Sequence, residues 1–252
     1  MSNNDNIKAG LITEEYMVAF IDILGASRKI KKDSAGSLNT VHRVYEKALK
    51  LYKSQSLSER HTTFCEDDTV EQIKTKIFSD NIVLYTRVND DSKGCFIHLV
   101  YLSAFMQAIF LNEGLLVRGG IAKGDFYGDD IMIWGNALVT AFEIENTIAV
   151  YPRIVVQSRI INGVGEEFAK EFECLSVDED GCYYVDYLSD SLFDDIDGAI
   201  NKAVDKCDIE LKNAGYKSDK ENSKVVQKLI WQKNYIERCR IRAQKREIKM
   251  IK

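Results

Sequence analysis

The order of the apolar segments between residues 15 and 157 restricts the fold of this chain more than any other feature. A short apolar run that ends in glycine, residues 15–25, is typical of a buried strand, and apolar residues at helical spacing follow over residues 37–53. Two short strands around a polar triplet come next, and the apolar run of residues 95–112 is long enough for a buried helix. The strand "LLVRGGIAKG" then follows this second helix.

The remaining segments complete an α+β pattern. "DDIMIW" is predicted as a strand, "NALVTAFEIENTIAV" as a helix and "PRIVVQ" as a further strand. The order β-α-β-β-α-β-β-α-β contains βαββαβ, the ferredoxin-like unit, in which an antiparallel sheet carries its helices on one face. Two terminal helices are predicted over residues 196–214 and 219–248. We therefore expect a domain over residues 1–195 and a helical extension over residues 196–252.

Composition and charge limit the expected location and partners. The chain has 252 residues, of which 45% are hydrophobic, and none of its apolar runs approaches the ~20 residues that a membrane span needs. Six cysteines without a C-x-x-C pair argue for reduced thiols, so we expect a cytoplasmic protein without a membrane segment. Ten Lys/Arg against two Glu make residues 224–252 basic. We expect a solvated helix face there, and no nucleic-acid partner.

Two aspartates stand where apolar strands end. Asp22 lies in "FIDILG", and Asp80 lies in the polar triplet of "KIFSDNIVLY", which is predicted as the turn of a hairpin. The ferredoxin-like topology places the first strand beside this hairpin, so the two carboxylates are expected to meet. Such a pair suits Mg²⁺ or Mn²⁺ and the phosphoryl-transfer chemistry of two metal ions. Each aspartate taken alone is more typical of a turn or helix cap, and only their matched settings at the ends of apolar strands favour a metal site.

An arginine interrupts the next strand. Arg118 in "LLVRGGIAKG" needs a partner, because burying an unpaired charge is unfavourable. A triphosphate suits the two-pronged donor geometry of its guanidinium group. A structural salt bridge remains an equally open interpretation.

Taken in this order, the motifs resemble those of the class III nucleotidyl cyclase catalytic domain. "FIDILGAS" is similar to the motif of the first metal-binding aspartate, and "KIFSD" to that of the second, with Ser79 in place of glycine. "RGGIAKG" is similar to the motif of the phosphate-binding arginine, and "WGNALVTA" to a helix start. The resemblance implies that Asp22, Asp80 and the carbonyl of Ile23 bind two divalent metal ions, Mn²⁺ or Mg²⁺. It also implies that Arg118 holds the triphosphate and that Lys76 reads the base.

Three positions depart from the family pattern. The adenine-reading aspartate corresponds to Met132, the transition-state asparagine to Val139 and the transition-state arginine to Glu143. Because a methionine cannot accept a hydrogen bond from an exocyclic amine as a carboxylate does, ordinary purine recognition is not expected. The candidates for replacing the missing groups are Asn136, Asn146 and Arg153. The full set of substrate-binding candidates is Lys76, Arg118, Met132 and Asn136.

This mixture of matches and departures resembles the pyrimidine cyclases of the bacterial Pycsar anti-phage system. The resemblance implies conversion of UTP, or less readily CTP, into the 3′,5′-cyclic nucleotide and pyrophosphate. It also implies a head-to-tail homodimer with its active sites at the interface, and a separate effector protein that reads the product. Three alternatives remain open: a non-catalytic nucleotide-binding or regulatory module, a purine cyclase, and a diguanylate cyclase. The last lacks support, because the sequence has no G-G-[DE]-E-F-like hairpin.

Overall fold

The computed structural model describes residues 11–56, 73–189, 192, 195–214 and 220–250, and the structural statements below concern these residues. Its strands are β1 (Glu14–Ile23), β2 (Lys74–Phe78), β3 (Asn81–Arg87), β4 (Val117–Gly128), β5 (Ile133–Trp134), β6 (Ile154–Val156), β7 (Leu175–Val177) and β8 (Tyr183–Val185). Its helices are α1 (Ala26–Lys32), α2 (Ser34–Ser56), α3 (Ser92–Asn112), α4 (Asn136–Glu143), the π-helix η2 (Ile144–Ile148), α5 (Ser158–Val164), α6 (Glu166–Glu171), α7 (Ile196–Ala214) and α8 (Lys220–Met250).

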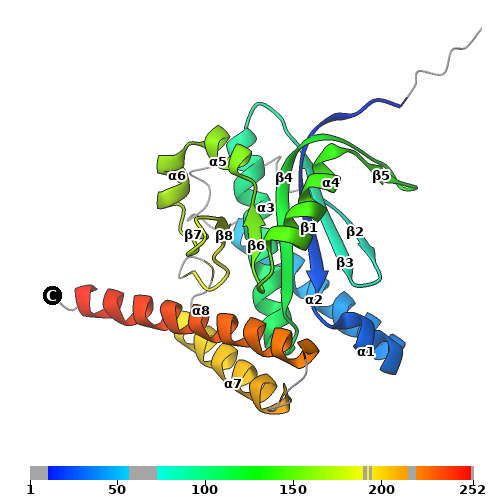
Figure 1. The fold of residues 1–252 in the computed structure, drawn as a ribbon. Coiled ribbons are helices and arrows are strands. Elements are labelled where there is room, and N and C mark those ends of the chain that lie inside the picture. The colour runs from blue at the N-terminus through cyan, green and yellow to red at the C-terminus, as the bar shows by residue number, and fades with distance from the viewer. Residues whose placement is uncertain (1–10, 57–72, 190–191, 193–194, 215–219, 251–252) are drawn as a thin grey trace, which may run out of the picture.

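The strands form one sheet in the order β2-β3-β1-β4-β6-β8-β7, and β5 pairs with β4 at its side (Figure 1). β1 runs antiparallel to both β3 and β4, and β2 runs antiparallel to β3. The first four strands therefore have the order and directions of a ferredoxin-like unit, with α2 and α3 as its crossover helices. The predicted α+β fold is confirmed, and β1 and the hairpin strand β3 are neighbours as expected.

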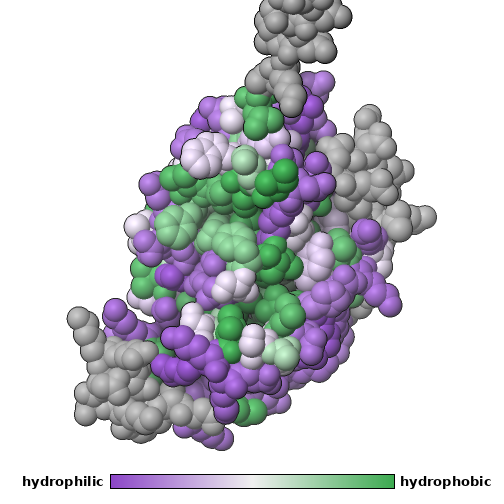
Figure 2. All heavy atoms as spheres, turned by 90° about the vertical axis from the view of Figure 1, so that its right-hand side faces the viewer, coloured by the Kyte–Doolittle hydropathy of each residue, from purple (hydrophilic) through white to green (hydrophobic). Residues whose placement is uncertain are grey.

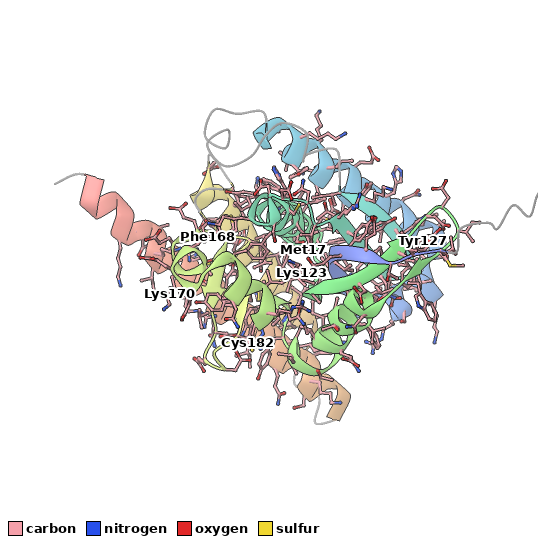
Figure 3. The ribbon with its side chains drawn as sticks, turned by 90° about the horizontal axis from the view of Figure 1, so that it is seen from above. Met17, Lys123, Tyr127, Phe168, Lys170 and Cys182 are labelled. Carbon is pink, nitrogen blue, oxygen red and sulfur yellow. The ribbon has the colours of Figure 1, made fainter. Side chains whose placement is uncertain are left out.

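The sheet separates two hydrophobic cores. Met17, Ala19 and Ile21 of β1 belong to the larger core under α2 and α3. Val18 and Phe20 belong to the smaller core under α4. Figure 3 looks along the sheet and shows helices on both of its sides. Because side chains alternate along a strand, Asp22 falls on the α4 side of the sheet, two residues after Phe20.

Helix α3 corrects one expectation from the sequence. It is long and apolar enough to cross a membrane, with a mean hydropathy of 1.8 over its most apolar window. The expectation that no apolar run reaches such a length was therefore wrong. However, 94% of that window is buried inside the fold, where α3 packs against α2 and the sheet. Its apolar composition reflects burial on all sides, as for the core helix of a folded domain.

Several predicted elements differ in extent. Only Ile133–Trp134 of the segment "DDIMIW" is a strand, while β4 continues to Gly128. The preceding turn is closed by Asp129, whose Oδ1 accepts hydrogen bonds from the backbone N–H groups of Ile131 and Met132 at 2.8 and 2.7 Å. The predicted helix over "NALVTAFEIENTIAV" is divided into α4 and η2. The short elements α1, α5, α6, β7 and β8 were not predicted, and residues 70–72 of the predicted hairpin lie outside the described residues.

The two terminal helices are present and pack together (Figure 1). α8 is fixed to the sheet through Asp186, just after β8. The carboxylate of Asp186 is 1% exposed, and it accepts hydrogen bonds from the Tyr235 hydroxyl at 2.7 Å and from Arg242 Nη1 at 2.6 Å. Trp231 stacks between the rings of Tyr151 and Tyr235. The domain boundary at residue 195 stays a prediction.

Candidate functional site

The strand register brings the three predicted phosphoryl-transfer residues together. Asp22 is paired with Asn81 on β3 and with Arg118 on β4. The backbone N–H of Ile23 donates to the carbonyl of Asp80 at 3.0 Å, which ties the hairpin tip to the end of β1. Asp22 on β1 and Arg118 on β4 thus lie at the same end of neighbouring strands as Asp80, which stands in the turn before β3, as the topology predicts.

The hairpin tip is a two-residue turn, Ser79–Asp80, because Asn81 already belongs to β3. Ser79 has a φ of 55°, the left-handed conformation that glycine adopts without steric cost. The turn presents the Asp80 carboxylate to Ser27 of α1, whose hydroxyl donates to it at 3.2 Å, and to the Asn81 amide at 3.3 Å.

Arg118 joins two carboxylates. Its Nε donates to Asp22 Oδ2 at 3.3 Å, and its Nη2 lies 2.6 Å from Oε1 of Glu145 in η2. Glu145 is only 3% exposed. The sequence analysis did not find Glu145, although a signal exists: it stands four residues after the buried Ala141, on the apolar side of the helix.

Electrostatics at this edge favour a bound cation. Burial raises the pKa of Asp22, Arg118 opposes this shift, and the negative charge of Asp80 adds to it. Burial likewise raises the pKa of Glu145, against the influence of Arg118. Lys228 of α8 also faces this cluster: burial lowers its pKa, and so does the nearby charge of Arg118. Crowded carboxylates of this kind are relieved when a divalent cation binds.

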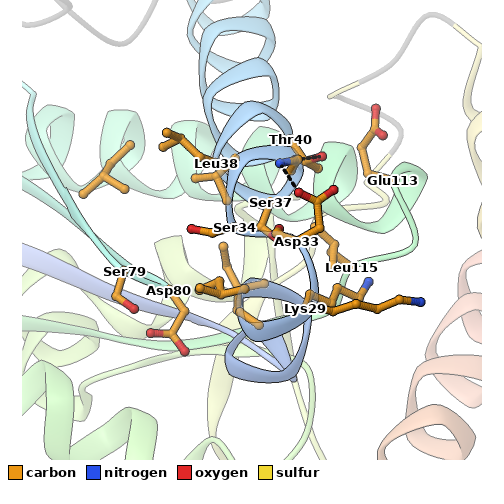
Figure 4. Close-up of a pocket in the computed structure, with 17 residues that line it drawn as sticks. Lys29, Asp33, Ser34, Ser37, Leu38, Thr40, Ser79, Asp80, Glu113 and Leu115 are labelled. Carbon is orange, nitrogen blue, oxygen red and sulfur yellow. Dashed lines mark hydrogen bonds between the residues drawn. The ribbon is translucent and has the colours of Figure 1, made fainter.

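A cavity of about 690 Å³ adjoins the hairpin tip. Ser79 and Asp80 lie on one side of it, and residues of α1 and α2, including Asp33 and Ser34, lie on the other (Figure 4). Its volume is within the range of small-molecule sites. Asp80 therefore stands at the wall of a space that can receive a ligand.

The predicted base-reading residues form a second group. Lys76 on β2 donates from Nζ to the carbonyl of Asp130 at 3.1 Å, in the turn that also holds Met132, whose side chain is 47% exposed. Asn136 is exposed at the start of α4, where its Oδ1 accepts a hydrogen bond from Thr140 at 3.5 Å. Among the described residues, no hydrogen bond or ion pair joins Lys76, Met132 or Asn136 to the cluster around Asp22.

The candidates for the missing transition-state groups are placed differently. Arg153 is 2% exposed and engaged by Asp178 at 2.6 Å and by Asp180, so it is a structural residue and not a replacement for the missing arginine. Asn146 is exposed on η2. Val139 and Glu143, which hold the two departing positions, are exposed on α4.

The oxygen ligands of Asp22, Asp80 and Ile23 suit metal ions that keep several bound water molecules. In the described part of the chain, no group of three or more His, Cys, Asp or Glu side chains is placed to hold a metal ion. Mg²⁺ and similar ions usually take one or two protein carboxylates and complete their shell with water and substrate phosphates. Asp22 and Asp80, with the carbonyl of Ile23, fit that requirement.

The chain has only low similarity to known proteins. No family model matches the chain, and no curated protein matches it. The solved structures that align with it include the monomeric guanylyl cyclase domain of the RhoGC fusion protein from the aquatic fungus Blastocladiella emersonii, at 14% identity and a TM-score of 0.43, over 69% of this chain and 98% of that one. Another is the catalytic core of a rhodopsin-guanylyl cyclase with converted specificity in complex with ATPalphaS, at 15% identity and a TM-score of 0.43, over 69% and 96% of the two chains.

Proposed function

We propose that this chain is a metal-dependent nucleotidyl cyclase that converts a nucleoside triphosphate into the 3′,5′-cyclic nucleotide and pyrophosphate. The observation that carries the proposal is the meeting of Asp22, Asp80 and Arg118 at the same end of neighbouring strands. This grouping combines two carboxylates for divalent cations with a guanidinium group for phosphate. Asp80 also borders the cavity beside α1 and α2, but Asp22 and Arg118 do not line that cavity, so it carries no part of the proposal.

In this mechanism, Asp22, Asp80 and the carbonyl of Ile23 would hold two divalent ions, Mn²⁺ or Mg²⁺. Such ions, when bound, would supply Lewis-acid activation of the ribose 3′-hydroxyl and charge stabilisation at the α-phosphate. Arg118 binds the triphosphate and orients pyrophosphate for departure in line with the attacking oxygen. Ser27 and Asn81 orient the Asp80 carboxylate through their hydrogen bonds.

A homodimer would complete the site. The base-reading group around Lys76 and Met132 is separate from the Asp22 cluster within one chain, and a head-to-tail dimer would place the two groups opposite each other. An apolar surface suits this arrangement: Phe78 and Phe142 are 48% and 47% exposed, and their rings lie 6.4 and 5.4 Å from that of Phe20, two residues before Asp22. Figure 2 shows hydrophobic residues gathered on this side of the molecule, which also carries β2 and β5.

Replacing Phe142 with aspartate is expected to weaken self-association about 30-fold or more, because the variant must bury a charge in an apolar contact. Analytical ultracentrifugation over a concentration series measures this change, and turnover should fall in parallel. Val177→Asp is the matched control, since Val177 is 52% exposed on β7 at the opposite edge of the sheet. Equal dimerisation of the wild type and the Phe142 variant would remove this surface from the proposal.

The proposed substrate is a pyrimidine nucleotide, UTP before CTP. Met132 offers no hydrogen-bond acceptor for the exocyclic amine of adenine, and the resemblance to the Pycsar cyclases points the same way. By the same resemblance, we propose a cytoplasmic enzyme of anti-phage defence whose cyclic product is read by a separate effector protein. A purine cyclase would use the same residues to bind metal ions and phosphate. It is therefore kept as a separate outcome of the test.

The test is incubation of the purified chain with Mn²⁺ and each of the four nucleoside triphosphates, with identification of products by mass spectrometry. Formation of cyclic UMP or cyclic CMP supports the full proposal, and formation of cyclic AMP or cyclic GMP supports the cyclase with another base preference. Nucleotide binding without turnover by a correctly folded dimer would instead support a regulatory module. Val139 and Glu143 are the reason to test for that outcome, because they stand in place of both transition-state groups.

A further inference from the structure

Glu145 is a buried carboxylate that the proposed mechanism does not yet use. It is 3% exposed, and its Oε1 lies 2.6 Å from Nη2 of Arg118. Placing a carboxylate in the interior carries a large desolvation cost, which a single well-placed cation only partly offsets. A buried Glu145 therefore needs a reason beyond stability.

The local backbone is shaped to bring Glu145 to Arg118. Glu145 belongs to the π-helix η2, whose i→i+5 pattern is seen in the hydrogen bond from the N–H of Ala149 to the carbonyl of Ile144 at 2.8 Å. Short π-helical turns of this kind often occur at functional sites. The end of α4 and the start of η2 also pack very closely on β4: a Cβ atom at Gly120 would lie 2.3 Å from the carbonyl oxygen of Ala141 and 2.7 Å from Cβ of Ile144. Only glycine at that position lets the helix approach β4 this closely.

The guanidinium group of Arg118 contacts two carboxylates that have different proposed roles. Nε contacts Asp22, which is a proposed metal ligand, and Nη2 contacts Glu145. Among the described residues, Nη1 makes no hydrogen bond or ion pair. If a metal ion binds Asp22, the ion pair with Glu145 is the contact that still holds the guanidinium group in place. Nη1 is then available to a phosphate oxygen.

We propose that Glu145 is a positioning residue that holds Arg118 for contact with the polyphosphate of the substrate. This inference rests on the proposed function, in which Arg118 binds the triphosphate. The partly buried Lys228 of α8 is a second cationic side chain near the same cluster. A divalent cation bound at Asp22 would leave Arg118 and Lys228 to contact the polyphosphate.

The test measures binding of inorganic tripolyphosphate in the presence of Mn²⁺ by isothermal titration calorimetry, with the full chain. Glu145→Gln is expected to weaken binding about tenfold. In the enzyme assay, the KM for the nucleotide should rise by a similar factor while kcat changes less, because Glu145 touches no reacting atom. Glu46→Gln, an exposed glutamate on α2, is the matched control and should bind as the wild type does.

A double-mutant cycle separates positioning from a general structural role. In an Arg118→Met background, Glu145→Gln should cause no further loss of tripolyphosphate binding, because Glu145 acts through Arg118. An equal loss in both backgrounds overturns the proposal, and so does unchanged or tighter binding by Glu145→Gln, which would make the ion pair an inhibitory contact. If Glu145→Gln does not fold, Glu145→Asp is used instead and should show a smaller loss in the same direction.

The tripolyphosphate binding measurement does not depend on whether the chain is catalytically active. If no nucleotide is cyclised by the wild type, the proposed function fails, but the tripolyphosphate measurement still decides whether Glu145 positions Arg118. Absence of tripolyphosphate binding by the folded wild type overturns the inference itself.

Discussion

Replacing Asp22 with asparagine is expected to lower nucleotide turnover about 10²- to 10³-fold without loss of folding stability. The activity falls because the variant loses the anionic oxygen that would hold a divalent cation beside the α-phosphate. The fold is retained because asparagine has nearly the same shape, and its amide oxygen still accepts a hydrogen bond from Arg118 Nε. Product formation with Mn²⁺ and the preferred nucleotide measures the loss.

The stability of this variant follows from the pKa of Asp22. Burial raises that pKa above its ordinary value of 3.8, so the folded state disfavours the charged carboxylate. The contribution of this group to stability is therefore full below pH 3.8 and is lost as the pH rises through the raised pKa of the folded state. At pH 7, asparagine removes an unfavourable buried charge. The free energy of unfolding in urea should be equal to or higher than that of the wild type.

Binding of Mn²⁺ should make the wild type more stable than the Asp22→Asn variant. Mn²⁺ that binds only the folded wild type raises its thermal midpoint by mass action, and the asparagine variant should lose most of that shift. Asp125→Asn is the matched control, because Asp125 is exposed on the neighbouring strand β4 and should keep both turnover and the Mn²⁺ shift. An Asp22→Asn variant with unchanged turnover and an unchanged Mn²⁺ shift would falsify the assignment of Asp22 as a metal ligand.

The part of the site that could be predicted depends on long, regular elements. β1, β3, α3 and β4 each carry a clear apolar pattern, and their order fixes which strands are neighbours. Once β1 is known to lie beside β3, Asp22 and Asp80 are expected to be near each other. The pairing of Asp22 with Arg118 depends on the register of β1 and β4, which the sequence does not show.

The part that was missed depends on short elements and on tertiary contacts. β7 and β8 have three residues each, too few for a period to be recognised, and β8 is defined by pairing with the distant strand β6. Glu145 was missed because a single glutamate on the buried side of a helix gives no indication of its partner, and the contact with Arg118 is made only in the folded structure. Arg153 was considered for the active site because nothing in the sequence shows that Asp178 and Asp180 fold back onto it.

Replacing Arg153 with methionine is expected to lower the free energy of unfolding by about 3 kcal/mol, because it leaves the buried carboxylate of Asp178 with only the more distant Arg238, whose Nη2 lies 3.9 Å from Oδ1. Asp178 has a side chain only 8% exposed, and Arg153 Nη1 lies 2.6 Å from its Oδ2. The same carboxylate accepts a hydrogen bond from Trp231 Nε1 of α8 at 3.0 Å, so the variant should also loosen α8 from the sheet. Urea unfolding measures the loss, and hydrogen exchange of α8 amides locates it.

Two further variants distinguish the buried ion pair from the exposed one. Asp180→Asn should cost much less than Arg153→Met, because the Asp180 side chain is 45% exposed and its charge is screened by water. The double variant Arg153→Met with Asp178→Asn should recover part of the lost stability, since it removes the unpaired charge. If Arg153→Met alone were as stable as the wild type, the ion pairs of Arg153 would contribute nothing to the folded state.

The pH dependence of these variants gives an independent check. The hydrogen bond from Arg153 lowers the pKa of Asp180 from 3.8 to about 2 in the folded state. Its contribution to stability is therefore present above pH 3.8 and is lost as the pH falls toward about 2. The wild type should lose stability in this window, and Arg153→Met should lose less there, because its Asp180 keeps only the hydrogen bonds from Cys182 and its folded-state pKa lies closer to the ordinary value. An identical acid dependence in the two proteins would show that Arg153 does not set the pKa of Asp180.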